Sequence, residues 1–504
     1  MLEDSLKDIT KGASIIVIGM VIANLLGLIN QILMGRILGP AEYGLFNLGI
    51  SLLTILCVLP QFGLGQGLTQ FIPYNFTQKK FRQIDEAVNF SLKFTFIVGF
   101  LVSFLLFIFS DQIALTLFHN NEFGFILKLL SIALTFWALH NTAGSLTQGF
   151  KKPKYYVYIE NISMPILQLS IFVILSILGY NLLGAVVGFT VSTIFAAIAY
   201  IYIFKVKFSK KLSKIYSFEL EEKRKAQKDI LTLSYPLFLA GFTFLFMQYA
   251  DKIILGIYKT PTDVGIYTAA LTIATLVLFI YTAFSFNSRP VLAEYFAVKD
   301  IESMQKLYSS ITKWIFLLTF PIIIYFIFYS KDILGFIYGT KFTSGSIAMS
   351  ILCLGIAMNG LTGLSGETLV SIKKTKLNLA SEIVGAVSNI ILNIILIPSF
   401  GIVGSAIGTS ISIALRNFTS FFFVYKNLKF NPYNIDYIKI VLYSTLPLTG
   451  ICLFSKYFNI PWAFIITIPL FLVIYFEILN FTRFFDESDQ LIIDKIVNKL
   501  RSLF

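Results

Sequence analysis

Long apolar runs separated by short polar segments make up most of this 504-residue chain. A helix needs about 20 apolar residues to cross a bilayer. Runs of that length predict fourteen membrane-spanning helices, at 13–34, 46–71, 87–110, 125–148, 156–178, 183–204, 232–256, 266–288, 312–330, 346–370, 378–398, 403–425, 437–455 and 461–481. The second of these is the least regular, because it contains Pro60 and several glycines. The first lacks a small-residue cleavage site, so we do not interpret it as a signal peptide.

The second half of the chain repeats the first at an offset of about 221 residues. RILGPAEYGLF, at 36–46, returns as GIYKTPTDVGIY at 256–267, and FKKPK at 150–154 falls on IKKTK at 372–376. Pairs of glycines, prolines and acids keep this offset: Gly35 and Gly256, Pro40 and Pro261, Glu42 and Asp263, Gly44 and Gly265, Glu160 and Glu382. The first motif therefore marks the outer turn between helices 1 and 2 of each half.

This repeat predicts an all-α polytopic membrane protein of two six-helix lobes and two further helices. An even number of helices leaves both lobes in the same orientation, so we expect a pseudo-two-fold axis along the membrane normal, with substrate between the lobes. The expected parts are an N-lobe at 1–204, a basic linker at 205–231, a C-lobe at 232–425, helices 13 and 14 at 426–481, and a tail at 482–504.

Composition and charge agree with a membrane location. The chain is 56% hydrophobic and 13% charged, with a net charge of +13, whereas soluble domains are about 25% charged. Most lysines and arginines fall in alternate loops, which predicts a multi-pass protein of the cell (plasma) membrane with both termini in the cytoplasm. The basic excess then serves orientation, and nucleic acid is not an expected partner. The polar segments 205–230 and 482–504 predict amphipathic helices on anionic lipid.

Few residues are available for catalysis or metal binding. Cys57, Cys353 and Cys452 lie in apolar runs without paired spacing, and His119 and His140 are the only histidines. The sequence has no glycine-rich phosphate loop and no long outer loop, so ATP hydrolysis and glycosyl transfer are not expected. We expect a transporter that is not an enzyme and that has no cofactor other than a coupling ion such as Na⁺ or H⁺.

The motif RILGPAEYGLFNLG at 36–49, the twelve-plus-two helices, and DKIILGIYKTPTDVGIYTAA at 251–270 resemble one known family. This is the polysaccharide transport family, the Wzx-like lipid-linked oligosaccharide flippases of the multidrug/oligosaccharidyl-lipid/polysaccharide exporter superfamily. The resemblance covers residues 11–425. It implies alternating access, in which the lobes rock around a central cavity and carry a polyprenyl- or dolichyl-linked oligosaccharide from the cytoplasmic to the outer leaflet for surface glycan synthesis.

The same resemblance implies the partners and leaves one alternative function. The polyprenyl-linked glycan, membrane lipids and glycan-assembly enzymes are the implied partners of a monomer. Related lipid II flippases carry an Arg-Asp pair where this chain has Asn30 and Gln31, which argues against a peptidoglycan precursor as the substrate. The alternative is an ion-coupled small-molecule antiporter, of the multidrug type, with the same fold.

Polar side chains inside the predicted spans carry the candidate chemistry. A charge at mid-bilayer costs about 2.5–3.5 kcal/mol on insertion scales, so each one requires a reason. The candidates for substrate binding in the cavity are Arg416, Asp251, Lys252, Arg36, Asn30, Gln31 and Gln248. Arg416 lies deep in helix 12 with no acid close to it in the sequence, and it is the first candidate for an anion contact.

Each of these residues could instead have a structural role, and the sequence leaves both alternatives open. Asp251 and Lys252 serve either as an ion site and a phosphate or sugar contact, or as a partner for another helix and an anchor at the outer interface. Arg36 contacts a pyrophosphate or is a staple to Glu42 within the outer turn. The neutral amides suit sugar hydroxyls or hydrogen bonds between helices, worth about 0.6 kcal/mol on average. Glu160 and Glu382 are the gating candidates, each forming a local salt bridge or an inner gate between the lobes.

Overall fold

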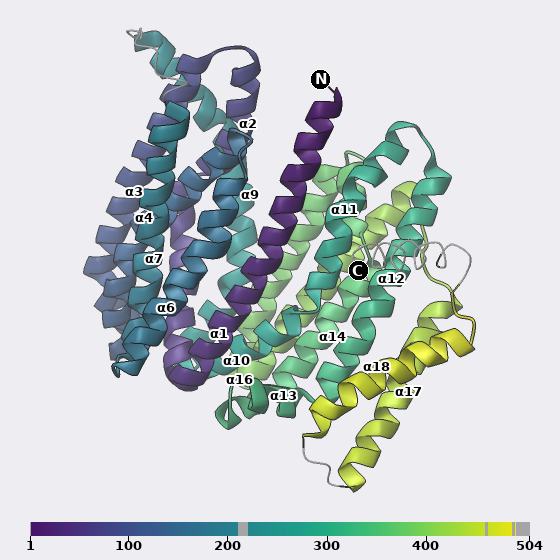
Figure 1. Ribbon diagram of the computed structural model, residues 1–504. Helices are drawn as coiled ribbons and strands as arrows, with labels where there is room; N and C mark the ends of the chain where they lie inside the picture. Colours follow the sequence, from purple (N-terminus) through teal and green to yellow (C-terminus); the bar gives the residue numbers. More distant parts are fainter. Residues whose placement is uncertain (1, 210–219, 459–461, 486–488, 490–504) are drawn as a thin grey trace. The chain divides into compact units, whose positions relative to one another are not determined.

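The structure is a computed structural model, and it describes residues 2–209, 220–458, 462–485 and 489. All regular elements in these residues are helical (Figure 1). The chain divides into two compact units, Met1–Thr268 and Ala269–Phe504. Residues 210–219 of the basic linker and most of the tail, 486–488 and 490–504, lie outside the described residues. The amphipathic helices expected there stay predictions.

The first unit contains the elements before Thr268 and the start of the helix that spans the division. In chain order they are α1 (Leu2–Gln61), α2 (Leu64–Thr77), α3 (Phe81–Thr116), α4 (Asn121–Gly149), α5 (Lys154–Tyr156), the π-helix η1 (Val157–Ser163), α6 (Met164–Ile177), α7 (Asn181–Ile203), the π-helix η2 (Phe204–Ser209), α9 (Leu220–Tyr258) and α10 (Pro261–Thr275).

The second unit contains the end of α10 and the helices that follow. They are α11 (Leu278–Ala297), α12 (Ile301–Phe328), α13 (Ser330–Ile337), the 3₁₀ helix η3 (Thr340–Gly345), α14 (Ser346–Thr362), α15 (Ser365–Ser371), α16 (Thr375–Leu428), α17 (Ile435–Tyr457) and α18 (Ala463–Phe481).

The helices account for the fourteen predicted crossings. Among the described residues, 11 helices are long and apolar enough to span a membrane, or 12 if the bent pair α10 and α11 is one span. Two of them have 41 and 54 residues, which is about 60 and 80 Å at 1.5 Å per residue, twice a bilayer or more. Each bends at a glycine with positive φ, Gly39 (φ 70°) and Gly401 (φ 54°). If each of these two long helices counts as two crossings, the total number of crossings rises from twelve to fourteen.

The irregularity predicted for the second span is confirmed. α1 ends at Gln61, and α2 begins at Leu64 after two residues with positive φ, Phe62 (φ 44°) and Gly63 (φ 69°). A Cβ at Gly63 would overlap the backbone of α9 at Ser234, so glycine permits both the break and the close approach of the two helices.

The C-terminal part of the basic linker, which the structure describes, packs against other helices of the protein. Residues 220–231 are the first three turns of α9, continuous with the predicted seventh span. Ile230 is fully buried in a cluster with Leu64 and Leu68 of α2 and Ile84 of α3. Gln227 on the same segment donates a hydrogen bond of 2.8 Å to Glu86. This apolar face therefore contacts helices of the first unit.

Candidate functional site

The two outer turns that repeat in the sequence lie against each other in the first unit. A Cβ at Gly44 would overlap the carbonyl oxygen of Pro261, and a Cβ at Gly265 would overlap the carbonyl oxygen of Pro40. The contact is reciprocal, because each glycine meets the proline of the other copy. Glycine is required at both positions since no side chain fits between the backbones.

Each turn is followed by a tyrosine that bonds back to the preceding helix. Tyr43 donates to Oε1 of Gln31 at 2.6 Å, and Tyr267 donates to Oδ2 of Asp251 at 2.6 Å. Both tyrosines are fully buried, and Asp251 is 3% exposed. The second bond has a carboxylate as its acceptor, so it is the stronger of the two. Asp251 on α9 thus pairs with a residue of another helix, α10, which is one of the two roles that the sequence left open.

The remaining candidates of the first unit have varied surroundings. The Nζ of Lys252 lies 5.3 Å from the centre of the Tyr249 ring, a cation–π distance. Asn30 is buried, and its Oδ1 has no hydrogen-bond partner in the part of the chain that the structure describes. Gln248 and Arg36 are exposed, so they are accessible to a ligand.

Glu160 contacts a histidine that the sequence analysis considered only as a metal ligand. Nε2 of His140, on α4, lies 3.4 Å from Oε2 of Glu160, on η1. The imidazole is fully buried, whereas the glutamate side chain is 26% exposed. The carboxylate therefore pairs inside the first unit, within the same half of the repeat.

Arg416 lies in a polar cluster of the second unit. Its Nη2 donates to Oδ1 of Asn359 at 3.2 Å and to Oδ1 of Asn417 at 3.4 Å, and Nδ2 of Asn417 also donates to Asn359 at 3.0 Å. Its Nη1 lies 3.8 Å from Oε2 of Glu382. The structure thus brings an anion candidate and a gating candidate together, from helices 12 and 11 of the repeat.

The guanidinium of Arg416 keeps donors for a ligand. It has five N–H groups in a planar fork, and among the described residues only Nη2 makes hydrogen bonds. The side chain is 26% exposed. An anion can therefore accept a hydrogen bond from Nε or from Nη1. Glu382 partly neutralises this charge, so a phosphate would compete with that carboxylate.

A neighbouring acid was missed by the sequence analysis. Glu367 accepts hydrogen bonds from Tyr281 at 3.0 Å and from Ser285 at 2.7 Å, and Arg289 lies 4.0 Å from it. Tyr281 also interacts electrostatically with Arg416, which connects the two clusters. Glu367 follows Gly366 at the end of the predicted tenth span, so an acid inside a span was the available signal.

The second unit also buries a lysine. Nζ of Lys313, on α12, lies 2.6 Å from Asp489 and 3.6 Å from Asp436, and Trp314 donates to Asp489 at 2.8 Å. Because both acids lie far from Lys313 in the sequence, no local pattern predicts this cluster.

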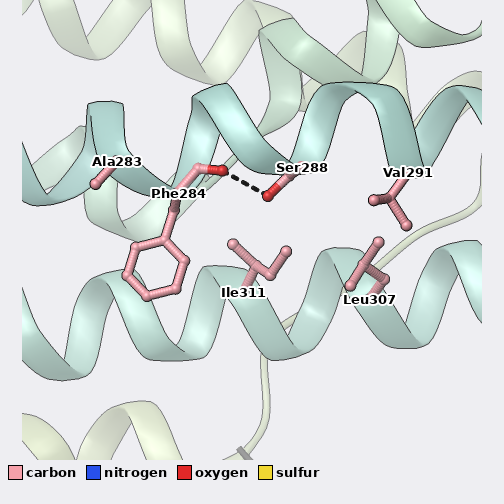
Figure 2. Close-up of a pocket in the computed structure, with 6 residues that line it drawn as sticks. All are labelled: Ala283, Phe284, Ser288, Val291, Leu307 and Ile311. Atoms are coloured by element: carbon pink, nitrogen blue, oxygen red, sulfur yellow. Dashed lines mark hydrogen bonds between the residues drawn. The ribbon is translucent and has the colours of Figure 1, made fainter. Parts of the chain in front are cut away.

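Between α11 and α12 lies a cavity of about 460 Å³. Figure 2 shows its lining of Ala283, Phe284, Ser288, Val291, Leu307 and Ile311. The one hydroxyl in this lining, on Ser288, donates to the carbonyl of Phe284 at 2.6 Å. The described part of the lining is thus apolar and offers no charged group to an anionic ligand.

Known proteins match this sequence and this fold. A model of the family described as "Polysaccharide biosynthesis protein" matches residues 9–296, and a MatE model matches residues 236–395. The chain is similar to "Probable low-salt glycan biosynthesis flippase Agl15" of Haloferax volcanii, at 27% identity over 171 residues, 34% of this chain and 36% of that protein. That match therefore spans about a third of the relative's length.

Two further matches extend over most of the chain. "Uncharacterized membrane protein MJ1068" of Methanocaldococcus jannaschii is 24% identical over 422 residues, 81% of this chain and 82% of that protein. The solved structure "Lipid II flippase MurJ, inward closed conformation" has a TM-score of 0.72 at 20% identity, covering 93% of this chain and 98% of that one. This likeness shows the fold. Because the first family model covers more than half of the sequence, the chain belongs to the polysaccharide biosynthesis protein family.

Proposed function

We propose that the protein moves a polyprenyl- or dolichyl-linked oligosaccharide from the cytoplasmic to the outer leaflet by alternating access. The observation that carries the proposal is the family match over residues 9–296. The names of two similar proteins, a probable glycan biosynthesis flippase and a lipid II flippase, support this substrate class.

The substrate's chemistry explains why such a protein is needed. Sugar hydroxyls and phosphates lose their hydration in hydrocarbon at a cost of several kcal/mol per polar group. A polar path inside the protein replaces that hydration. Outward movement of an anion also follows an inside-negative membrane potential, by about 2.3 kcal/mol per charge per 100 mV.

Arg416 suits the anionic linkage of this substrate. Its Nε and Nη1 make no hydrogen bond among the described residues, so each can donate to a phosphate oxygen, and the charge attracts the anion. Asn359 and Asn417 hold the other side of the guanidinium, which orients the fork before a ligand arrives. In the proposed cycle the phosphate displaces Glu382 from Arg416, and the carboxylate returns when the substrate leaves.

The proposal includes a location and partners. The protein acts in the cell membrane, with both termini in the cytoplasm, as a monomer and without catalysis of its own. Membrane lipids surround it, and glycan-assembly enzymes supply its substrate on the cytoplasmic side. Na⁺ or H⁺ is the coupling ion. Equal transport with and without an ion gradient would exclude the coupling.

The test is flipping of a fluorescent polyprenyl-pyrophosphate oligosaccharide in proteoliposomes. We expect wild type to flip, Arg416→Ala to lose at least about tenfold in rate, equal to about 1.4 kcal/mol of lost transition-state stabilisation, and Asp251→Asn to lose its response to an ion gradient. Arg224→Ala is the matched control, because this arginine is exposed on α9. A folded Arg416→Ala variant that flips at the wild-type rate would exclude Arg416 from the anion path.

A second function has one observation in its favour. The MatE model matches residues 236–395, which include Asp251, Lys252, Glu367 and Glu382. An ion-coupled antiporter would expel a small cationic dye from the same proteoliposomes against an ion gradient. Expulsion of the dye without flipping of the glycolipid would favour this second function.

A further inference from the structure

A buried polar cluster of the first unit has no role in the proposed anion path. It consists of His140 on α4, Glu160 on η1 and Tyr200 on α7. His140 is fully buried, and Tyr200 is 1% exposed. Glu160 is 26% exposed, so it lies between the buried imidazole and the outside of the unit.

The buried polar atoms of the histidine and the tyrosine lack hydrogen bonds. Among the described residues, neither Nδ1 nor Nε2 of His140 has a hydrogen-bond partner, and the hydroxyl of Tyr200 has none either. Buried polar groups are nearly always paired, so each exception requires an explanation. The 3.4 Å between Nε2 and Oε2 of Glu160 is within the reach of an ion pair. A proton placed between these atoms would satisfy one of the unpaired groups.

The local backbone is adapted to this arrangement. Glu160 lies on a seven-residue π-helix, an irregularity that occurs often at functional sites. On α4, one turn after His140, Gly144 would place a Cβ 3.2 Å from the Tyr200 ring, so glycine allows the tyrosine to approach the cluster.

The second half of the sequence repeat provides an internal comparison. Glu382 corresponds to Glu160, and Asn359 lies 219 residues after His140, close to the offset of the repeat. There the carboxylate faces Arg416, which stays charged at every physiological pH. Histidine, in contrast, changes its charge near neutral pH. Of these two carboxylate pairs, only the first has a titratable partner.

We propose that His140 and Glu160 form a proton-binding site in the first unit, which exchanges one proton with the compartment that Glu160 faces. The bound proton comes from water, is shared between Nε2 and Oε2, and returns to water when the ring turns away. Occupation of the site changes the packing of α4 against η1 and α7. The further step, that this change drives the transport cycle, rests on the proposed function.

The groups around the pair are mostly uncharged. Tyr156 on α5 and Tyr200 on α7 are the titratable neighbours that interact electrostatically with Glu160. From α1, Gly19 faces Val157 and Asn161 of η1. From α3, Thr95 lies 3.3 Å from the hydroxyl of Thr142 on α4, and from α6 Met164 packs against the buried cluster that contains Tyr200. Within the described residues, Glu160 has no lysine or arginine at ion-pair distance.

The direct test is nuclear magnetic resonance of the full chain in lipid nanodiscs, with ¹⁵N-labelled histidine. The chain has two histidines, so a His119→Asn variant leaves His140 as the only labelled residue. His119 is exposed with φ 51°, a conformation that asparagine tolerates. We expect the His140 signal to change between neutral imidazole and imidazolium in one step as the pH of the sample is varied.

Two variants identify the partner. Glu160→Gln should move the midpoint of this titration, because it removes the carboxylate that lies 3.4 Å from the ring. Glu382→Gln, in the second unit, should leave the midpoint unchanged. An imidazole that stays neutral over the whole range would overturn the proton site. A midpoint that is the same in Glu160→Gln would overturn the pairing.

Flipping in proteoliposomes tests the transport step separately. We expect the wild-type rate to change by up to about tenfold per pH unit on one side of the midpoint, and the rate of Glu160→Gln to lose this dependence. A pH profile that Glu160→Gln leaves unchanged would overturn the coupling. If wild type flips no glycolipid at any pH, the proposed function fails, while the resonance experiment still decides whether the proton site exists.

Discussion

Replacing Tyr267 with phenylalanine tests whether Asp251 is a buried carboxylate held by a charged hydrogen bond. The tyrosine is fully buried and donates to Asp251 at 2.6 Å. Tyr43 is equally buried and donates at 2.6 Å to the neutral amide of Gln31. The two Tyr→Phe substitutions remove the same atom at the same burial and hydrogen-bond distance, and the acceptors are a carboxyl group and a neutral amide.

The expected magnitudes follow from that difference. A hydrogen bond to a charged group contributes about 1.5–3 kcal/mol, and one between neutral groups about 0.5–1.5 kcal/mol. Measured bonds between membrane helices average about 0.6 kcal/mol, so we expect Tyr43→Phe near the lower limit. Tyr267→Phe should therefore reduce the free energy of unfolding by about 1–2 kcal/mol more than Tyr43→Phe, a factor of roughly 5–30 in the folded-to-unfolded ratio.

The assay is reversible unfolding of the purified protein in mixed detergent micelles, followed by loss of helicity. The single variants Asp251→Asn and Tyr267→Phe and their double variant complete a cycle that measures the coupling of the pair. Equal costs for the two Tyr→Phe variants would refute the reasoning, because the acceptor charge would then contribute nothing. A coupling near zero would refute the hydrogen bond itself.

Two further perturbations act on packing and on a buried charge. Gly44→Ala should destabilise the first unit or force the outer turns apart, because the new Cβ overlaps the carbonyl of Pro261. Gly27→Ala should be neutral or stabilising, since no atom of the described residues lies within 4 Å of its Cβ. Lys313→Ala should destabilise the protein by about 3–5 kcal/mol, because it removes the cation that lies 2.6 Å from the buried carboxylate of Asp489, whereas Lys306→Ala should have little effect, since its pair is exposed.

The same unfolding assay measures these four variants. If Gly44→Ala is as stable as Gly27→Ala, the close contact of the two turns does not exist in the folded protein. If Lys313→Ala unfolds at the same detergent concentration as Lys306→Ala, the carboxyl of Asp489 is not charged or not buried.

The number of crossings and the two breaks of the repeat could be predicted without a structure. A run of apolar residues is a local property, and a bilayer imposes one length on every crossing. Gly39 with Pro40, and the repeated Gly-Pro and Thr-Pro motifs, mark the turns because glycine and proline restrict or release local backbone angles. The structure adds that the two turns contact each other, which no local pattern encodes.

The partners of the polar residues could not be predicted from the sequence. Arg416 has no acid near it in the chain, but the fold places Glu382 3.8 Å away. Glu367 meets Tyr281 across 86 residues, and Lys313 meets Asp489 across 176. A sequence shows that a buried charge requires compensation, because its isolated burial is costly. It does not show which distant residue supplies that compensation, because the choice depends on which helix faces pack together.

The amino-acid sequence by itself thus determined the membrane class, the helices and the duplication, all of which follow from composition and spacing along the chain. Only the tertiary structure decided that Asp251 bonds to Tyr267, that Glu160 meets a buried histidine, and that Arg416 keeps free donors beside a carboxylate. The physical reason is that hydrophobic transfer acts on each segment separately, whereas hydrogen bonds and ion pairs require atoms to meet within about 3–4 Å.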